Sequence, residues 1–146
     1  MDDSLFPGVS AEVRGVLDYY GTVTLLMEDG FPTTTSHHTP KSPEGKLLGG
    51  VYVMEHPELA AKASAVTHIT RGKKLPPICI FHGTKDRTAN ARQSVEFYEK
   101  LRACGKEARL YLIAGADHCG PEFWAEQAVN AAAGFMRKCL EKPQEK

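Results

Sequence analysis

Two short polar segments of the sequence hold side chains that could act as an acid or a base. One reads HGTKDR at residues 82–87, and the other reads GADHCG at residues 115–120. Each directly follows an apolar run of strand length, at 78–81 and 109–114. In an open parallel sheet, ligands bind at the carboxyl ends of the strands, where the loops converge. The two segments are therefore the candidate sites for chemistry in this chain.

Three apolar runs are predicted to form the strands that position these segments. The runs lie at about 13–20, 77–82 and 109–114, and each ends next to a glycine. Because helical patterns alternate with these short runs, the sequence predicts an α/β fold with a three-stranded parallel sheet and right-handed crossovers. At 146 residues, the chain is expected to be a single domain, residues 1–146.

Helices are predicted on the faces of this sheet at about 91–104 and from Pro121 onward. Asn90 stands three residues before Gln93, which is the spacing of a capping box, and Gly105 supplies a C-terminal stop. Pro121 is a residue type that commonly opens a helix. These features place one helix after each of the two polar segments.

The segment from about 22 to 70 lacks clear periodicity and is rich in glycine and proline. One short helix is expected within it, at about 57–63. A loop of this length is uncommon inside a compact domain and is often functional. We therefore expect an irregular, cap-like insertion between the first two strands.

Composition and charge exclude several classes of protein. Eighteen Lys and Arg residues balance eighteen Asp and Glu residues, so the formal net charge is zero and neither nucleic acid nor a membrane surface is an expected partner. No stretch approaches the roughly 20 apolar residues of a membrane helix, and the acidic start is unlike a secretory signal. The four cysteines form no C-x-x-C pair, so free thiols and a cytoplasmic location are expected.

Two stretches, PPICIFHGTKDRTANARQSVEFYEKL and YLIAGADHCGPEFW, resemble the C-terminal half of α/β-hydrolase esterases and lipases. The resemblance is to the bacterial group of feruloyl- and acetylxylan-esterase-like enzymes in particular, and VRGVLDYYG is similar to the strand that leads into their cap region. It implies a partial α/β-hydrolase fold and hydrolysis of a small-molecule carboxylic ester by a Ser-His-Asp triad, without a cofactor. It also implies that Asp86 is the acid and His118 the base.

The nucleophile that this resemblance requires is missing from the sequence. The family's serine stands in a G-x-S-x-G turn, with a glycine-rich loop upstream that helps to form the oxyanion hole. No serine here has the two flanking glycines, and Ser94 falls inside a predicted helix. We therefore expect a C-terminal fragment of a serine esterase that is inactive alone. The alternatives are a non-catalytic half-domain for self-association or partner binding, and a thiol-dependent or redox protein using Cys119.

Four further residues, near the two polar segments or in the insertion, are candidate site residues. Asp117 is an alternative acid, although a solvated or capping role is favoured for it. His82 ends a strand before a glycine, which favours a buried, hydrogen-bonded structural histidine. Trp124 and, more weakly, Phe31 are candidate walls of a substrate pocket, since ligand sites are mostly apolar.

No metal site is expected. His37 and His38 are adjacent, but they lie in a loop rich in Thr, Ser and Pro and lack a spaced third ligand. Histidines in this setting are usually solvated, which is the expectation for both.

The strand at 13–20 is expected to make the chain a homo-oligomer. In a whole hydrolase, the strand that bears the nucleophile would pair with its outer edge, and that neighbour is absent here. A bare strand edge is a template for association, and one two-fold contact would close it. A homodimer is therefore the predicted state.

Overall fold

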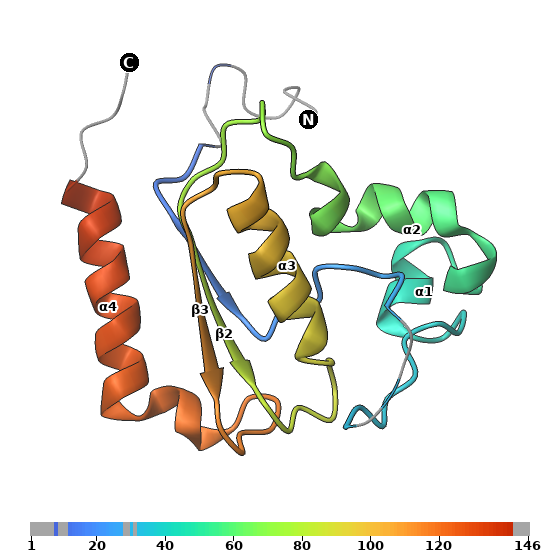
Figure 1. Cartoon of the computed structure of the whole chain (residues 1–146). Coiled ribbons are helices and arrows are strands. Elements are labelled where there is room, and N and C mark those ends of the chain that lie inside the picture. Colours follow the sequence, from blue (N-terminus) through green and yellow to red (C-terminus); the bar gives the residue numbers. More distant parts are fainter. Residues whose placement is uncertain (1–7, 9–11, 28–29, 31, 142–146) are drawn as a thin grey trace.

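The computed structural model of the chain describes residues 8, 12–27, 30 and 32–141. Its centre is a sheet of three parallel strands in the order β1-β2-β3 (Figure 1). The strands are β1 Val16–Tyr19, β2 Ile78–Gly83 and β3 Ala108–Ile113. In the register of the sheet, Ile78 lies opposite Val16 on one side and Ala108 on the other. The predicted α/β class with a three-stranded parallel sheet is confirmed.

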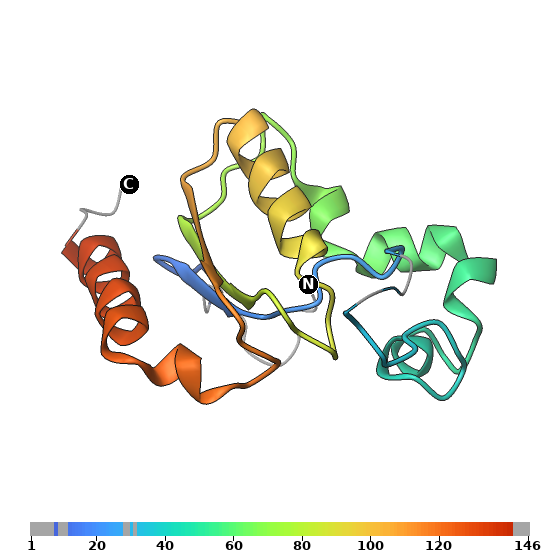
Figure 2. The ribbon, with the colours of Figure 1, turned by 60° about the horizontal axis from the view of Figure 1, so that its bottom comes forward.

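Helices cover both faces of the sheet, α3 (Arg92–Ala103) on one face and α4 (Glu126–Glu141) on the other (Figure 2). Every residue of the central strand β2 is therefore buried, which explains its unbroken apolar run. Alternate side chains of β2 enter two cores. On one face, Ile78 and Ile80 pack with Phe97 and Leu101 of α3. On the other face, Cys79 and Phe81 pack with Phe135 and Cys139 of α4.

The insertion between β1 and β2 contains more regular structure than expected. It holds the α-helices α1 (Pro43–Leu47) and α2 (Pro57–Ala63) and the 3₁₀ turns η1 (Val53–Glu55) and η2 (Ala65–His68). The short helix predicted at about 57–63 is confirmed, whereas α1 and the two 3₁₀ turns were not predicted. Pro43, which was interpreted as a turn former, opens α1, and Leu25, Val53 and Ala60 form a small core.

The start of α3 differs from the predicted capping box. The side chain of Asn90 accepts a hydrogen bond from the backbone N–H of Arg92 (3.0 Å), and Ala91 is the residue at the N-cap position. The buried side chain of Gln93 instead accepts from the backbone N–H of Val23 (2.8 Å). The capping box was wrong because a buried backbone N–H of the insertion needs the Gln93 oxygen as its partner.

Two predicted boundaries also shift. The helix expected from Pro121 is a 3₁₀ turn, η3 (Pro121–Trp124), followed by α4, because the extended backbone of Ala125 (φ −60°, ψ 148°) separates them. The first strand ends at Tyr19, because Tyr20 adopts a positive φ of 47°. None of the helices within the described residues is both long and apolar enough to cross a membrane.

The outer edge of β1 has no neighbouring strand among the described residues. Beside this edge, a groove of about 360 Å³ with mostly apolar walls separates β1 from α4. Val13, Leu17, Met136 and Leu140 are among the residues that line it. An open strand edge next to an apolar groove is a surface suited to association.

We propose that this edge and groove pair with a second copy of the chain. A two-fold axis normal to the sheet would pair β1 with β1 and place both grooves on the same face. Replacing the half-exposed Met136 with lysine should then convert a dimer into a monomer, because a buried ammonium group in the interface has no partner. Light scattering at micromolar concentration measures the mass. The matched variant Leu47→Lys, on the exposed side of α1, should leave it unchanged. A monomeric wild-type chain would contradict the proposal.

Candidate active site

The two polar loops that follow β2 and β3 lie side by side. Any Cβ atom at Gly83 would stand 2.4 Å from the carbonyl oxygen of Ala116, so only glycine permits this approach. The same carbonyl accepts from the backbone N–H of Lys85 (3.0 Å), and the Thr84 hydroxyl accepts from the N–H of Gly115 (2.9 Å). The backbone itself therefore brings the two candidate loops together.

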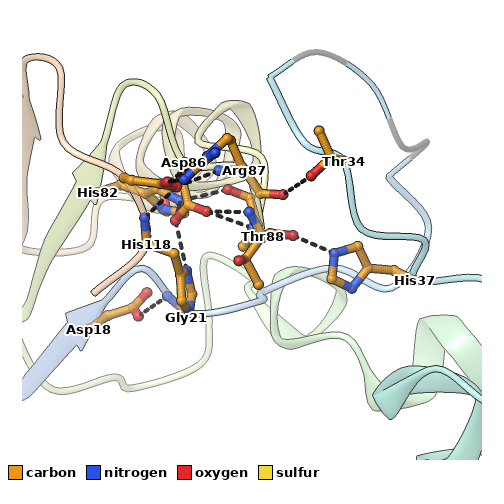
Figure 3. A network of polar contacts seen from close by, with 12 residues as sticks. Asp18, Gly21, Thr34, His37, His82, Asp86, Arg87, Thr88 and His118 are labelled. Atoms are coloured by element: carbon orange, nitrogen blue, oxygen red, sulfur yellow. Dashed lines mark hydrogen bonds and ion pairs between the residues drawn. The ribbon is translucent and has the colours of Figure 1, made fainter. Parts of the chain in front are cut away.

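The carboxylate of Asp86 is fully buried and is surrounded by hydrogen-bond donors. Its Oδ1 accepts from the backbone N–H groups of Thr88 and Ala89, both at 2.8 Å. Its Oδ2 lies 2.8 Å from Nδ1 of His118 and 3.2 Å from Nε2 of His82 (Figure 3). The Asp86 carboxylate therefore lies within hydrogen-bond distance of the His118 ring.

These contacts set the charge of Asp86 and the orientation of His118. Burial alone raises the pKa of Asp86, but the hydrogen bonds from His82, Ala89, His118 and Thr88 together outweigh it and hold the pKa below the ordinary carboxyl value. An ionised Asp86 only accepts, so Nδ1 of His118 carries the proton. The side chain of His118 is 27% exposed.

His82 supports Asp86 from inside the core. The ring is fully buried, with Nε2 3.0 Å from the carbonyl oxygen of Ala89 and Nδ1 2.7 Å from the hydroxyl of Ser94. Because the carbonyl only accepts, Nε2 carries the proton and Nδ1 accepts from Ser94. The prediction of a buried, hydrogen-bonded His82 is confirmed. Ser94 is itself fully buried and engaged in this bond.

Asp117 faces the neighbouring loop, whereas Asp86 faces the imidazole. Its Oδ1 accepts from the backbone N–H groups of Arg87 (2.9 Å) and His118 (2.8 Å), and its Oδ2 accepts from Nε of Arg87 (2.6 Å). The hydrogen bonds from Arg87 and from the His118 backbone lower the pKa of Asp117 to about 2. Asp117 thus ties the two loops together.

An aromatic ring that sequence reasoning did not single out packs on the imidazole. The rings of Tyr20 and His118 have centroids 4.5 Å apart and planes inclined by 58°. Among the described residues, the non-glycine residues with positive φ are Tyr20 (47°) and Cys119 (58°), and a hydrogen bond between their side chains raises the pKa of Tyr20. Strained residues of this kind cluster at functional sites. No local signal before Gly21 reveals this conformation.

Of the two candidate pocket residues, the structure describes Trp124. The Trp124 side chain is 66% exposed, and its ring stacks on Tyr19, with centroids 6.0 Å apart and planes inclined by 14°. Phe31 lies outside the described residues. A substrate-binding role for either residue stays a prediction.

His37 is bonded rather than solvated, so that expectation was wrong. Its side chain is 17% exposed, with Nδ1 2.8 Å from Oε1 of Glu44 and Nε2 2.5 Å from the carbonyl oxygen of Thr88. The reason is that the insertion folds back onto the loop of Asp86, which sequence spacing does not show. Within the described ranges, no group of three or more His, Cys, Asp or Glu side chains is arranged to hold a metal ion.

Several solved structures share this fold. The chain is similar to a truncated carbohydrate esterase from gut microbiota, with a TM-score of 0.76 and 23% identity over 89% of this chain and 44% of that one. A bifunctional GH43-CE protein of Bacteroides eggerthii has a TM-score of 0.78 and 26% identity, and the match covers 92% of this chain and 16% of that one. Butyrate-bound esterase 2 of Thermogutta terrifontis has a TM-score of 0.62 and 19% identity, and the match covers 95% of this chain and 48% of that one. The architecture is that of α/β-hydrolase esterases.

Curated relatives match shorter parts of the sequence. Esterase LipC of Mycobacterium tuberculosis is 36% identical over 64 residues, 43% of this chain and 15% of that protein. The non-reducing polyketide synthase Preu3 of Preussia isomera is 32% identical over 85 residues, 57% of this chain and 3% of that protein. The chain thus spans less than half the length of each relative named here. The family model of BD-FAE matches residues 4–101, which is more than half of the sequence and includes Asp86. The chain belongs to the BD-FAE family, an esterase-like family of α/β-hydrolases.

Proposed function

We propose that this chain supplies the acid and the base of a serine carboxylesterase and does not hydrolyse esters alone. The observation that carries the proposal is the 2.8 Å contact between the buried carboxylate of Asp86 and Nδ1 of the partly exposed His118. A buried acid that orients an imidazole, with the second ring nitrogen open, is the arrangement that acyl transfer requires. Several of the similar proteins are esterases, which supports the same reaction class.

In the proposed reaction, Nε2 of His118 takes the proton of a serine hydroxyl as its oxygen attacks the ester carbonyl. Ionised Asp86 stabilises the resulting imidazolium through the bond at Nδ1. His118 then returns the proton to the leaving alkoxide, which departs as the alcohol and leaves an acyl-serine. A water molecule repeats the sequence and releases the carboxylic acid. The serine and the oxyanion donors come from polypeptide other than the residues described here.

The assignment of the acid favours Asp86 over Asp117 for a geometric reason. Asp86 binds the ring of His118, whereas Asp117 binds the backbone N–H of the same residue and the guanidinium of Arg87. Only a contact with the ring can hold its tautomer and stabilise its charge.

A thiol-based reaction at Cys119 is the second candidate. Cys119 is exposed and follows the base directly, which favours reactivity. Its side chain, however, lies beside Tyr20, whose ring packs on the imidazole of His118. A non-catalytic half-domain is the remaining alternative, supported by the edge of β1, which has no neighbouring strand among the described residues.

The chain by itself should not turn over p-nitrophenyl acetate faster than its His118→Ala variant does. A base without a nucleophile and oxyanion donors has little to activate, and the variant corrects for catalysis by the bare imidazole. Initial rates at equal protein concentration test this. Turnover that His118→Ala abolishes would contradict the proposal, and turnover that only Cys119→Ser abolishes would establish the thiol alternative.

A chimera tests the two roles directly. Residues 12–141 would replace the matching half of the carbohydrate esterase from gut microbiota, whose fold they share. In a folded, active chimera, Asp86→Asn and His118→Ala should each lower kcat/KM by about 10³-fold or more, because the remaining groups act only as a unit. Asp117→Asn, which leaves the ring contact intact, should cost far less. An Asp86→Asn chimera as active as its parent would remove Asp86 from the mechanism.

The acid dependence of stability should report the role of Asp117. Its pKa in the folded chain, about 2, lies below the ordinary value of 3.8, so its contribution to stability is fully present above about pH 4 and is lost as the pH falls toward 2. Asp117→Asn should therefore lower Tm at pH 7, and the difference from wild type should close between pH 4 and pH 2. Glu99→Gln, at an exposed position of α3, is the matched control and should leave Tm nearly unchanged. Equal curves of Tm against pH for all three proteins would show that the contacts of Asp117 with Arg87 and His118 do not contribute to stability.

A further inference from the structure

The insertion contacts the loop of Asp86 from the side opposite the core. The backbone N–H of Thr34 donates to the carbonyl oxygen of Arg87 (2.9 Å), and Nε2 of His37 contacts the carbonyl oxygen of Thr88 (2.5 Å). Figure 3 shows Thr34 and His37 on one side of this loop and His118 on the other. The acid is therefore held between the core and the insertion.

These two carbonyls belong to the peptide units whose N–H groups bind Asp86. The carbonyl of Arg87 shares a peptide unit with the N–H of Thr88, and the carbonyl of Thr88 shares one with the N–H of Ala89. Both N–H groups donate to Oδ1 of Asp86 at 2.8 Å. Each amide thus accepts a hydrogen bond from the insertion and donates one to the acid. In such chains, each hydrogen bond polarises the next and strengthens it.

The chain through His37 begins at a charged pair. Nδ1 of His37 faces a carboxylate oxygen of Glu44 in α1, at 2.8 Å, and Nε2 faces the Thr88 carbonyl. The Thr88 carbonyl can only accept, and so can Glu44 when it is ionised, so with Glu44 ionised both ring nitrogens carry protons and the imidazole is cationic. Glu44 is buried, and the other titratable group that lines the small cavity beside the pair is His38.

We infer that His37 is a positioning residue for Asp86, which it holds through the peptide unit between Thr88 and Ala89. The effect of His37 on catalysis rests on the proposed function, whereas the hydrogen-bond chain itself does not. Protonated His37 polarises this amide and strengthens its bond to the carboxylate. Deprotonation at Nε2 removes the donor to the Thr88 carbonyl. The strength of the hydrogen bond between the Ala89 N–H and Asp86 should therefore depend on pH.

Amide NMR of the isolated ¹⁵N-labelled chain tests the inference without ester hydrolysis. In His37→Ala, exchange of the Ala89 N–H with solvent should accelerate about ten-fold or more, while the N–H of Ile80 in the buried strand β2 keeps its rate. In wild type, the Ala89 amide shift should follow the titration of the His37 ring signals, and this dependence should vanish in the variant. His37→Gln, which keeps a donor but no charge, should restore slow exchange without restoring the pH response.

A matched control separates this coupling from a general loss of stability. His56→Ala removes an exposed histidine elsewhere in the insertion, so it should behave as wild type. Equal acceleration at Ala89 and Ile80 in His37→Ala would overturn the inference, since it would reflect global opening. An Ala89 amide shift that does not follow the titration of His37 would overturn the inference as well.

In the active chimera described above, His37→Ala should lower kcat about ten-fold with KM nearly unchanged, and His37→Gln should recover most of this loss. Coupling at the Ala89 amide with an unchanged kcat would refute the positioning role. An inactive chimera that retains the coupling would refute the proposed function and leave the hydrogen-bond chain intact.

Discussion

The buried carboxylate of Asp86 is the constraint on which the surrounding structure depends. An ionised group with no access to water is stable only where donors replace its hydration shell. Two backbone N–H groups and two imidazoles do so here, and together they keep its pKa low despite burial. Loss of any one donor would leave charge uncompensated in the interior. The loops, the first turn of α3 and the insertion are all arranged around this requirement.

Parallel pairing of β2 with β3 is what makes such a site possible. Two adjacent strands that run in the same direction end at the same edge of the sheet, so the loops after them must meet. Gly83 then allows the loops to touch through the Ala116 carbonyl, and Asp117 joins them through Arg87. The imidazole of His118 is fixed by this frame because its backbone N–H and its ring bond to different carboxylates, Asp117 and Asp86.

The insertion contributes to the same site although it belongs to neither strand end. It occupies the stretch between β1 and β2 and has a small core of its own, yet Gln93 ties its start to α3 and His37 ties it to the acid loop. Polar contacts of this kind have little sequence signature, since they join residues about 50 to 70 positions apart. Through these contacts the insertion becomes part of the electrostatic environment of the site.

Local patterns in the sequence determined the class of fold and the strands to within a few residues, and the resemblance to α/β-hydrolase esterases then singled out Asp86 and His118. Local patterns sufficed for the fold because apolar periodicity and the order of strand and loop are local properties, and parallel topology then dictates which loops meet. Only the tertiary structure decided that Gln93 bonds to the insertion rather than capping α3, that Tyr20 packs on His118, and that His37 is bonded. Each of these depends on which distant backbone group lies within reach, and that is set by packing, not by spacing along the chain.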